Sequence, residues 1–215
     1  MERILAVGDI HGCYGKLVSL MEKVKINPDK DRVVFIGDYI DRGDQSYEVV
    51  EFLIQFKKKA PSAVFLLGNH EQMLLEYLSG KNINPFLFNG GQKTLNSYLS
   101  QGGHKSFQDP RKIFPLDHLD FFKSLIPFFE FGNYIFVHAG LRKGIPLESQ
   151  SLFDLLWIRE EFYYSQYDFG KTVIFGHTPF PEPFEYKSKV GIDTGAVYGN
   201  KLTCVELPSM TYYAV

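Results

Sequence analysis

The chain has 215 residues, of which 45% are hydrophobic and 22% charged, and its formal net charge is −2. This balance is ordinary for a soluble globular protein and lacks the basic excess of proteins that bind nucleic acid or anionic membranes. Two cysteines, Cys13 and Cys204, are too few for a disulfide framework, and no apolar run is long enough for a secretory segment or a membrane span. We therefore expect one cytoplasmic, monomeric domain over residues 1–215, with no nucleic-acid or membrane partner.

Short β-type runs and helical patterns alternate in the first part of the chain. We predict strands at Ile4–Val7, Val33–Ile36, Val64–Leu67, Tyr134–Val137, Val173–Phe175, Val190–Ile192, Leu202–Glu206 and Thr211–Ala214. Apolar residues at helical spacing predict helices at Tyr14–Val24, Ser46–Lys58 and Glu71–Leu78. Residues 80–116 are richer in Gly, Asn and Pro, which indicates an insertion of loop and short helix. The alternation predicts an α/β fold, and the closely spaced later strands indicate mixed or antiparallel pairing.

Polar side chains follow six of these predicted strands directly. In chain order, the strands run into GDIHGCY, GDYIDRG, GNHE, HAG, GHT and DTG. Open α/β sheets build their sites at the carboxyl ends of strands, and the glycines let the backbone turn sharply and approach a ligand. We therefore expect these six segments to form one site.

The residue types at these strand ends are those of a divalent metal centre. Asp9 and His11 are two apart, a spacing that points both side chains the same way in an extended segment. The other candidate ligands are Asp38, Asn69, His138 and His177. Mixed oxygen and nitrogen ligands suit manganese, iron or zinc. Six ligands are many for a single ion, so we expect two ions with Asp38 as the bridge, an arrangement that suits phosphoryl transfer.

Further polar residues surround this ligand set. Arg42 follows the Asp38 strand end, where a guanidinium would bind phosphate oxygens as a fork. Asp41 is placed to orient His70, which follows Asn69 and would protonate a leaving oxygen. Glu71 is more simply a carboxylate at a helix start.

The segments GDIHG, GDYIDRG, GNHE, HAG and GHT, in this order, resemble the metal-dependent phosphoprotein phosphatases of the calcineurin-like metallophosphoesterase family. The resemblance extends from Gly8 to about Leu207. GNHEQM, NGG at Asn89–Gly91, LWIRE at Leu156–Glu160 and IDTGAV at Ile192–Val197 are similar to the compact bacterial and phage branch, which includes bacteriophage lambda protein phosphatase and bacterial diadenosine tetraphosphatases. The whole set is specific, whereas any one segment alone would be a weak signal.

The resemblance implies an αββα sandwich of two mixed sheets flanked by helices, with two divalent metals, manganese first and iron or zinc as alternatives, at the sheet edge. One metal would take Asp9, His11 and Asp38, and the other Asp38, Asn69, His138 and His177. His70 with Asp41 would form the acid pair, and a hydroxide bridging the metals would attack phosphorus in line. Substrate contacts are implied at Arg42, Arg159, Asn69, His70 and Asn89.

Simpler interpretations stand beside these roles. A single histidine such as His138 is more often a core residue, and Arg42 could pair with Asp41 at the surface. Arg159 lies in WIREEF, which also reads as a solvated helix face, and Asn89 reads equally well as a turn residue. Several aromatic residues could stack on a nucleobase or pack in the core: Phe86, Phe88, Tyr163, Tyr164 and Tyr167.

The metal motifs do not separate the substrates that such a centre handles. We expect a serine/threonine protein phosphatase that hydrolyses phosphate monoesters, because the chain leaves little room for a cap and its loop cations are scattered: Lys81, Lys93, Lys105, Arg111 and Lys112. The alternative is a hydrolase of diadenosine tetraphosphate or a related dinucleoside polyphosphate. A third hypothesis, a non-catalytic binding module on this fold, predicts a missing ligand or a replaced His70, and neither is seen.

Overall fold

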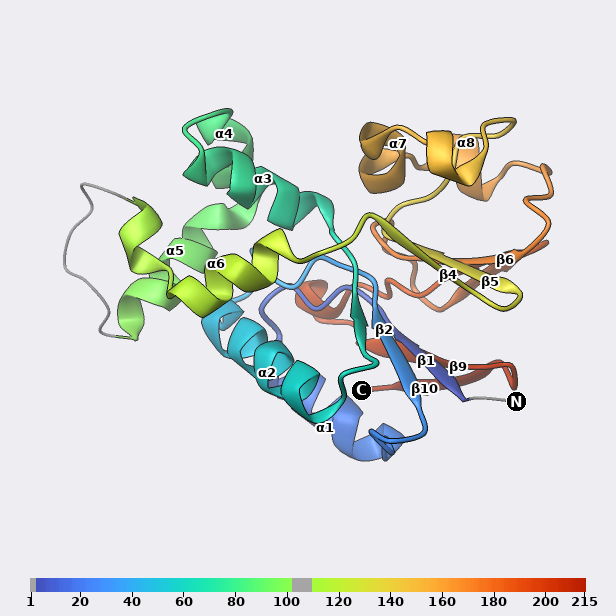
Figure 1. Ribbon diagram of the computed structural model, residues 1–215, viewed down its shortest axis with the longest axis horizontal. Helices are drawn as coiled ribbons and strands as arrows, with labels where there is room; N and C mark the ends of the chain where they lie inside the picture. Colours follow the sequence, from blue (N-terminus) through green and yellow to red (C-terminus); the bar gives the residue numbers. More distant parts are fainter. Residues whose placement is uncertain (1–2, 102–109) are drawn as a thin grey trace.

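The computed structural model describes residues 3–101 and 110–215, which form two five-stranded sheets packed face to face (Figure 1). The first sheet has the order β10-β9-β1-β2-β3 and the second the order β4-β5-β6-β8-β7. The strands of the first sheet are β1 (Ile4–Val7), β2 (Arg32–Phe35), β3 (Val64–Phe65), β9 (Thr203–Leu207) and β10 (Thr211–Ala214). Those of the second are β4 (Phe128–Phe131), β5 (Tyr134–Val137), β6 (Thr172–Phe175), β7 (Phe184–Tyr186) and β8 (Lys189–Gly191).

The first sheet is parallel toward its β3 edge and antiparallel toward its β10 edge, whereas the second is parallel in its middle and antiparallel at both edges. The runs β1-β2-β3 and β5-β6-β8 are parallel. The pairs β1-β9, β9-β10, β4-β5 and β7-β8 are antiparallel. The mixed pairing expected from the spacing of the later strands is therefore confirmed.

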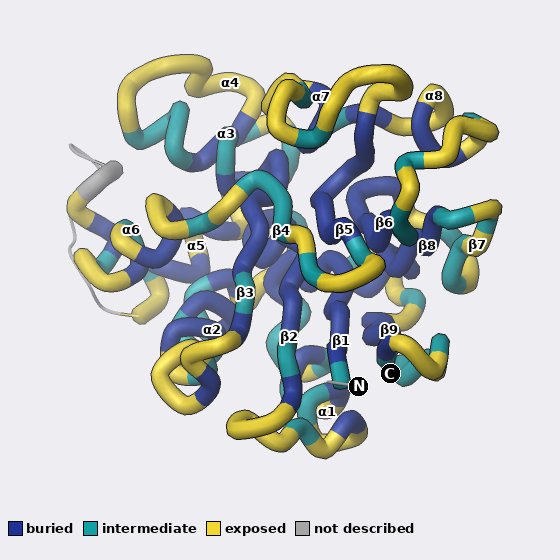
Figure 2. Tube along the Cα trace, turned by 45° about the vertical axis from the view of Figure 1, so that its right-hand side comes forward, coloured by how far each residue is buried: buried dark blue, intermediate teal, exposed yellow. Residues whose placement is uncertain are grey.

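Side chains alternate across each sheet and fill three layers of core. In β1, Ile4 and Ala6 pack between the two sheets, whereas Leu5 and Val7 pack against the helices on the outer face. In β5, Phe136 enters the layer between the sheets, and Ile135 packs outward. Strands covered on both faces read as continuous apolar runs, which is why β1 and β5 show no polar alternation (Figure 2).

Helices cover the outer face of each sheet and complete the expected αββα arrangement (Figure 1). Against the first sheet lie α1 (Tyr14–Val24) and α2 (Ser46–Lys59). A further group of helices packs on α2 and shares the same core: α3 (Asn69–Leu78), α4 (Ile83–Phe86), η1 (Leu87–Gly91), α5 (Gln92–Ser100), η2 (Pro110–Ile113) and α6 (Leu116–Lys123). The second sheet carries η3 (Leu147–Ser149), α7 (Leu152–Trp157) and α8 (Glu160–Tyr163), and the turn η4 (Ala196–Tyr198) precedes β9. No helix in the described ranges is long and apolar enough to cross a membrane.

Two strands and part of the insertion differ from the prediction. β4 and β7 were not predicted; they are edge strands of only four and three residues with partly exposed side chains, and a glutamate interrupts the aromatic residues of each. The segment expected to be loop and short helix contains the nine-residue helix α5, and its residues 102–109, including Lys105, lie outside the described residues. α3 begins at Asn69, two residues before its expected start, which places Asn69 and His70 in its first turn.

Candidate metal centre

The carboxyl ends of β1, β2 and β3 in the first sheet and of β5 and β6 in the second each lead into one of the predicted polar segments. All six predicted ligands are buried, with at most 6% of any residue exposed: Asp9, His11, Asp38, Asn69, His138 and His177. Burying this many polar and ionisable groups together is costly unless they pair with one another or with a cation.

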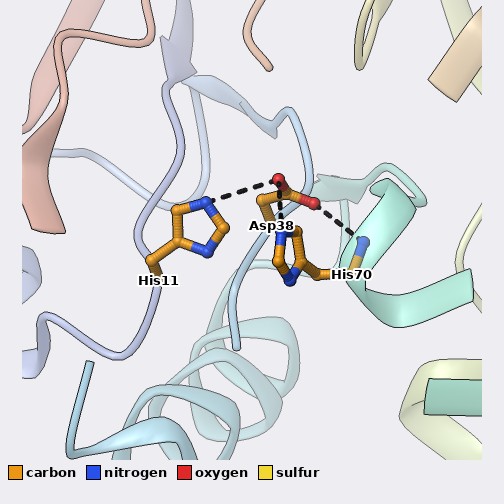
Figure 3. Close-up of side chains that lie close together, drawn as sticks. All are labelled: His11, Asp38 and His70. Carbon is orange, nitrogen blue, oxygen red and sulfur yellow. Dashed lines mark hydrogen bonds and ion pairs between the residues drawn. The ribbon is translucent and has the colours of Figure 1, made fainter. Parts of the chain in front are cut away.

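Asp38 lies at the middle of two groups of side chains that are close enough to hold a metal ion; one group contains His70, which was not a predicted ligand, and neither contains Asp9. His11, Asp38 and His70 form one group and Asp38, His138 and His177 the other, and within each group the ligand atoms lie within 4.8 Å of one another. Asp38 Oδ2 is 3.4 Å from His11 Nε2, and Asp38 Oδ1 is 3.4 Å from His138 Nε2. Figure 3 shows His11 and His70 on different sides of the Asp38 carboxylate. A carboxylate shared in this way occupies the place of a bridging ligand.

The hydrogen bonds of His138 test whether a cation fits. Its Nδ1 lies 2.9 Å from the carbonyl oxygen of Ile36, which can only accept, so Nδ1 carries a proton. His138 Nε2 lies 2.9 Å from Asn69 Oδ1, another acceptor, so either Nε2 carries a second proton or the two atoms share a cation. Two buried nitrogens, His70 Nε2 and His177 Nε2, have no hydrogen-bond partner among the described residues. Such a contact and the orphaned nitrogens fit a divalent cation with mixed ligands.

The charges of the cluster point the same way. Burial opposes ionisation of Asp38, but the imidazoles of His138, His70 and His11 hold its pKa well below the usual range. Burial likewise opposes a charge on His138, yet Asp38 raises the pKa of that imidazole to about 9. Burial, with Asp193 nearby, raises the pKa of Asp9 well above its usual range. In the absence of a cation the cluster would retain protons, which a divalent ion would displace.

The local backbone differs from the expected one at the first segment. His11 has a left-handed φ of 45°, so the inference from an extended Asp9–His11 spacing is wrong. Asp9 turns toward the second sheet, where Oδ2 accepts a hydrogen bond of 3.0 Å from the His177 backbone N–H. A Cβ at Gly176 would lie 2.1 Å from Asp9 Oδ1, so the glycine before His177 is needed for this approach. The two side chains therefore meet the cluster from different directions.

Glu71 organises the Asp38 segment and was not predicted to do so. Its buried carboxylate accepts from four backbone N–H groups: Gly68 (3.1 Å) and Asp38 (2.9 Å) at Oε2, and Tyr39 (2.8 Å) and Ile40 (3.3 Å) at Oε1. It caps the start of α3, as its position suggested, but it also fixes the backbone that carries Asp38. The sequence motif GNHE draws attention to this glutamate, but it does not predict the contact with a segment about 30 residues earlier in the chain.

His70 and Asp41 form a closed pair beside the first group. His70 Nδ1 lies 2.6 Å from Asp41 Oδ2, and neither residue is exposed. Thr94 Oγ1 donates to Asp41 Oδ1 at 2.5 Å, a contact with α5 that the sequence did not indicate. Burial lowers the pKa of His70 to about 4 and raises the pKa of Asp41 well above its usual range. The pair leaves His70 Nε2 free, 3.9 Å from Asp38 Oδ2.

The two arginines reach the cluster from opposite sheets, whereas Asn89 does not reach it. Arg42 Nη1 lies 2.7 Å from His11 Nε2. Arg159 stands at the break between α7 and α8, not on a helix face, and its Nη1 lies 3.3 Å from Oγ1 of Thr178, next to His177. The Asn89 side chain donates from η1 to the carbonyl of Pro85 in α4 at 2.8 Å. Asn89 thus lies in a helical segment, and its predicted contact with substrate stays a prediction.

The aromatic residues considered for base stacking fall into two sets. Phe86 and Tyr163 are buried and belong to the core. Phe88, Tyr164 and Tyr167 are exposed. Among residues that the sequence reasoning did not single out, Asp193 is buried near Asp9, where burial raises its pKa to about 6. Its position after β8, in DTG, was the available signal.

Comparisons with known proteins find relatives that match nearly the whole chain. The asymmetrical bis(5'-nucleosyl)-tetraphosphatase PrpE of Bacillus cereus (strain B4264) is 27% identical over 97% of this chain and 92% of its own length. The protein of the same name from Geobacillus sp. (strain WCH70) is 26% identical over 99% of this chain and 94% of its own length.

Two solved structures share the fold. One, provisionally assigned as a diadenosine tetraphosphatase, superposes with a TM-score of 0.76 at 24% identity and covers 100% of this chain and 93% of its own. A mutant of a cold-active protein tyrosine phosphatase superposes with a TM-score of 0.75 at 18% identity and covers 100% and 77%. A family model described as calcineurin-like phosphoesterase matches residues 2–202. The chain belongs to the calcineurin-like phosphoesterase family.

Proposed function

We propose that this chain is a metal-dependent hydrolase of dinucleoside tetraphosphates. The observation that carries the proposal is the similarity over nearly the whole length to asymmetrical bis(5'-nucleosyl)-tetraphosphatases, which covers 97% of this chain and 92% of the Bacillus cereus protein. The likeness to protein phosphatases, at 18% identity or below, supports the fold alone. The comparisons therefore favour the alternative substrate over the phosphoprotein that the sequence led us to expect first.

The scattered loop cations do not oppose a polyphosphate substrate. Lys93 is engaged by Asp44, 2.6 Å away, and lies on the exposed surface. The positive charge that a polyphosphate needs would come instead from divalent ions held by the two groups of candidate ligands. Arg42 and Arg159, which flank these groups, would add to it. A short chain can therefore bind a polyanion without a basic loop.

Asp38 with Asp9 and His11 would hold one divalent ion, and Asp38 with Asn69, His138 and His177 a second. Manganese is the proposed ion, with iron and zinc as alternatives. Such ions would neutralise phosphate charge and lower the pKa of a water molecule toward neutrality. The burial of the ligand set and the orphaned Nε2 of His177 support this assignment.

The remaining residues would bind substrate and move a proton. Arg42 and Arg159 would hold phosphate oxygens from two sides of the cluster, each by a fork of N–H donors. Asp41 fixes Nδ1 of His70, so that Nε2 faces the cluster and is placed to protonate the leaving oxygen. Hydrolysis of an outer P–O–P linkage would yield a nucleoside triphosphate and a monophosphate, whereas hydrolysis of the central linkage would yield two diphosphates.

A paired assay tests the proposal. Purified, manganese-loaded protein is given diadenosine tetraphosphate or a phosphothreonine peptide, and products are separated by chromatography. We expect ATP and AMP from the nucleotide and much slower phosphate release from the peptide. Fast peptide turnover without nucleotide cleavage would reinstate the protein phosphatase. Bound metal with no activity on either substrate would favour the non-catalytic module.

A further inference from the structure

An exposed tyrosine stands beside the arginine of the candidate centre. Tyr198 is the last residue of the turn η4, and 63% of it is exposed. The Arg42 guanidinium carbon lies 5.7 Å from the centre of its ring, within the range of a cation–π contact. The same guanidinium reaches His11 Nε2 at 2.7 Å. Arg42 therefore lies between an aromatic face and the metal ligands.

The turn that carries Tyr198 is held at several points that do not involve the ring. Lys16 of α1 donates to the carbonyls of Ala196, at 2.9 Å, and Asn200, so one ammonium group joins both ends of the turn. The Gly195 N–H donates to Asp193 Oδ1 at 2.9 Å, and the Thr194 hydroxyl donates to the carbonyl of Lys201 at 2.7 Å. These contacts hold the backbone in place, so the ring is presented to solvent from a fixed position and little of it is buried.

We propose that Tyr198 is the stacking platform for a nucleobase of the substrate, with Arg42 binding the adjoining phosphate. This inference rests on the proposed function. In a nucleotide, a ribose separates the base from the phosphate, so a base platform and a phosphate-binding arginine side by side match that order. Stacking uses the face that every base has, so the platform would accept adenine and guanine alike. The substrate class is thus dinucleoside tetraphosphates with little discrimination between purines.

Other exposed aromatic residues fit this role less well. Tyr164 is also 63% exposed, but its ring packs on Tyr163, with centroids 4.6 Å apart, in the α8 region. Phe88 is 87% exposed on η1. Of the exposed aromatic residues in the described ranges, Tyr198 is the one that has an arginine over its ring. Tyr164 provides a control that is matched in residue type and exposure.

The experiment compares Tyr198→Ala, Tyr198→Phe and Tyr164→Ala with the wild-type protein, all manganese-loaded. KM for diadenosine tetraphosphate is measured with the inhibition constants of AMP and of inorganic phosphate. For Tyr198→Ala we expect KM and the AMP constant to rise about tenfold, and the phosphate constant to change less than threefold. Tyr198→Phe keeps the ring and should stay within about threefold of wild type for AMP, as should Tyr164→Ala. Thermal midpoints show whether each variant is folded.

Two failures are distinguishable. If wild-type protein cleaves diadenosine tetraphosphate and Tyr198→Ala binds AMP as tightly as wild type, the platform is overturned and the proposed function stands. A loss of AMP binding in Tyr164→Ala instead would move the platform to α8 and also overturn this inference. If wild-type protein neither cleaves the nucleotide nor binds AMP, the proposed function fails and the platform fails with it.

Discussion

Glu71 accepts four backbone N–H groups with two carboxylate oxygens, two at each oxygen. In Glu71→Gln, one oxygen becomes an NH₂ group, so two N–H donors would face another donor whichever way the amide is turned. We expect the free energy of unfolding to fall by about 2 kcal/mol, the cost of leaving buried donors unsatisfied, and the affinity for manganese to fall as well. Urea unfolding and metal titration measure the two effects.

Glu76→Gln is the control for this change. Glu76 lies on the same helix, α3, but its carboxylate accepts from the side chains of Gln72 and Asn82 and lies nearer the surface. Its replacement should leave metal affinity within error of wild type. If Glu71→Gln and Glu76→Gln unfold at the same urea concentration and bind manganese equally, the four N–H contacts do not hold the Asp38 segment.

His70 has one nitrogen fixed by Asp41 and the other free toward the cluster. Asparagine at this position keeps a polar group of similar reach but has no nitrogen that can pass on a proton. We predict that His70→Asn lowers kcat by about 100-fold or more, while the number of bound metals is unchanged, because the proposed ligand sets do not include His70. Steady-state kinetics and elemental analysis of the same preparation measure both. An unchanged kcat would remove the proton-transfer role.

At the scale of elements, the strands that are buried on both faces could be predicted from their apolar runs. The polar segments that follow these strands could be predicted as well. β1, β5 and β10 match their predicted bounds, and α1 matches both of its ends. What could not be read depends on contacts distant in sequence. The hydrogen bond from Thr94 to Asp41 joins residues that are 53 apart in the sequence. The edge strands β4 and β7 form through pairing with β5 and β8. The reasoning about Asp9 and His11 failed on a left-handed φ, a backbone choice that apolar patterning does not encode.

The break between α7 and α8 is the element that presents Arg159. Ser151 caps α7 by accepting from the Asp154 N–H at 3.0 Å, and Ile158 is extended, so Arg159 leaves the helix axis and approaches Thr178. We predict that Arg159→Ala raises KM for diadenosine tetraphosphate about tenfold with a smaller change in kcat, because a charge-assisted contact with phosphate is lost. Arg159→Lys keeps the charge and should recover part of the loss. Kinetics identical to wild type in Arg159→Ala would restore the solvated surface role.

At the scale of the whole molecule, the candidate centre lies where the two sheets meet, and both sheets contribute side chains to it. Asp9, Asp38 and Asn69 follow strands of the first sheet, whereas His138 and His177 follow strands of the second. Without a cation, the two sheets are joined here by hydrogen bonds such as the one from the His177 N–H to Asp9 and the one from His138 Nδ1 to the carbonyl of Ile36. A cation bound by both sets of ligands would tie the sheets together and would bind the folded state alone.

Stability should therefore depend on manganese. At a free concentration 100 times the dissociation constant, binding adds about 2.7 kcal/mol to the free energy of unfolding, which raises the thermal midpoint of a chain of this size by about 5–10 °C. A chelator should reverse the shift. Asp38→Asn removes the carboxylate common to both groups and should abolish most of the shift, whereas Asp44→Asn, an exposed carboxylate paired with Lys93, should keep it. An equal shift in both variants would mean that manganese binds elsewhere and that Asp38 does not join the sheets through an ion.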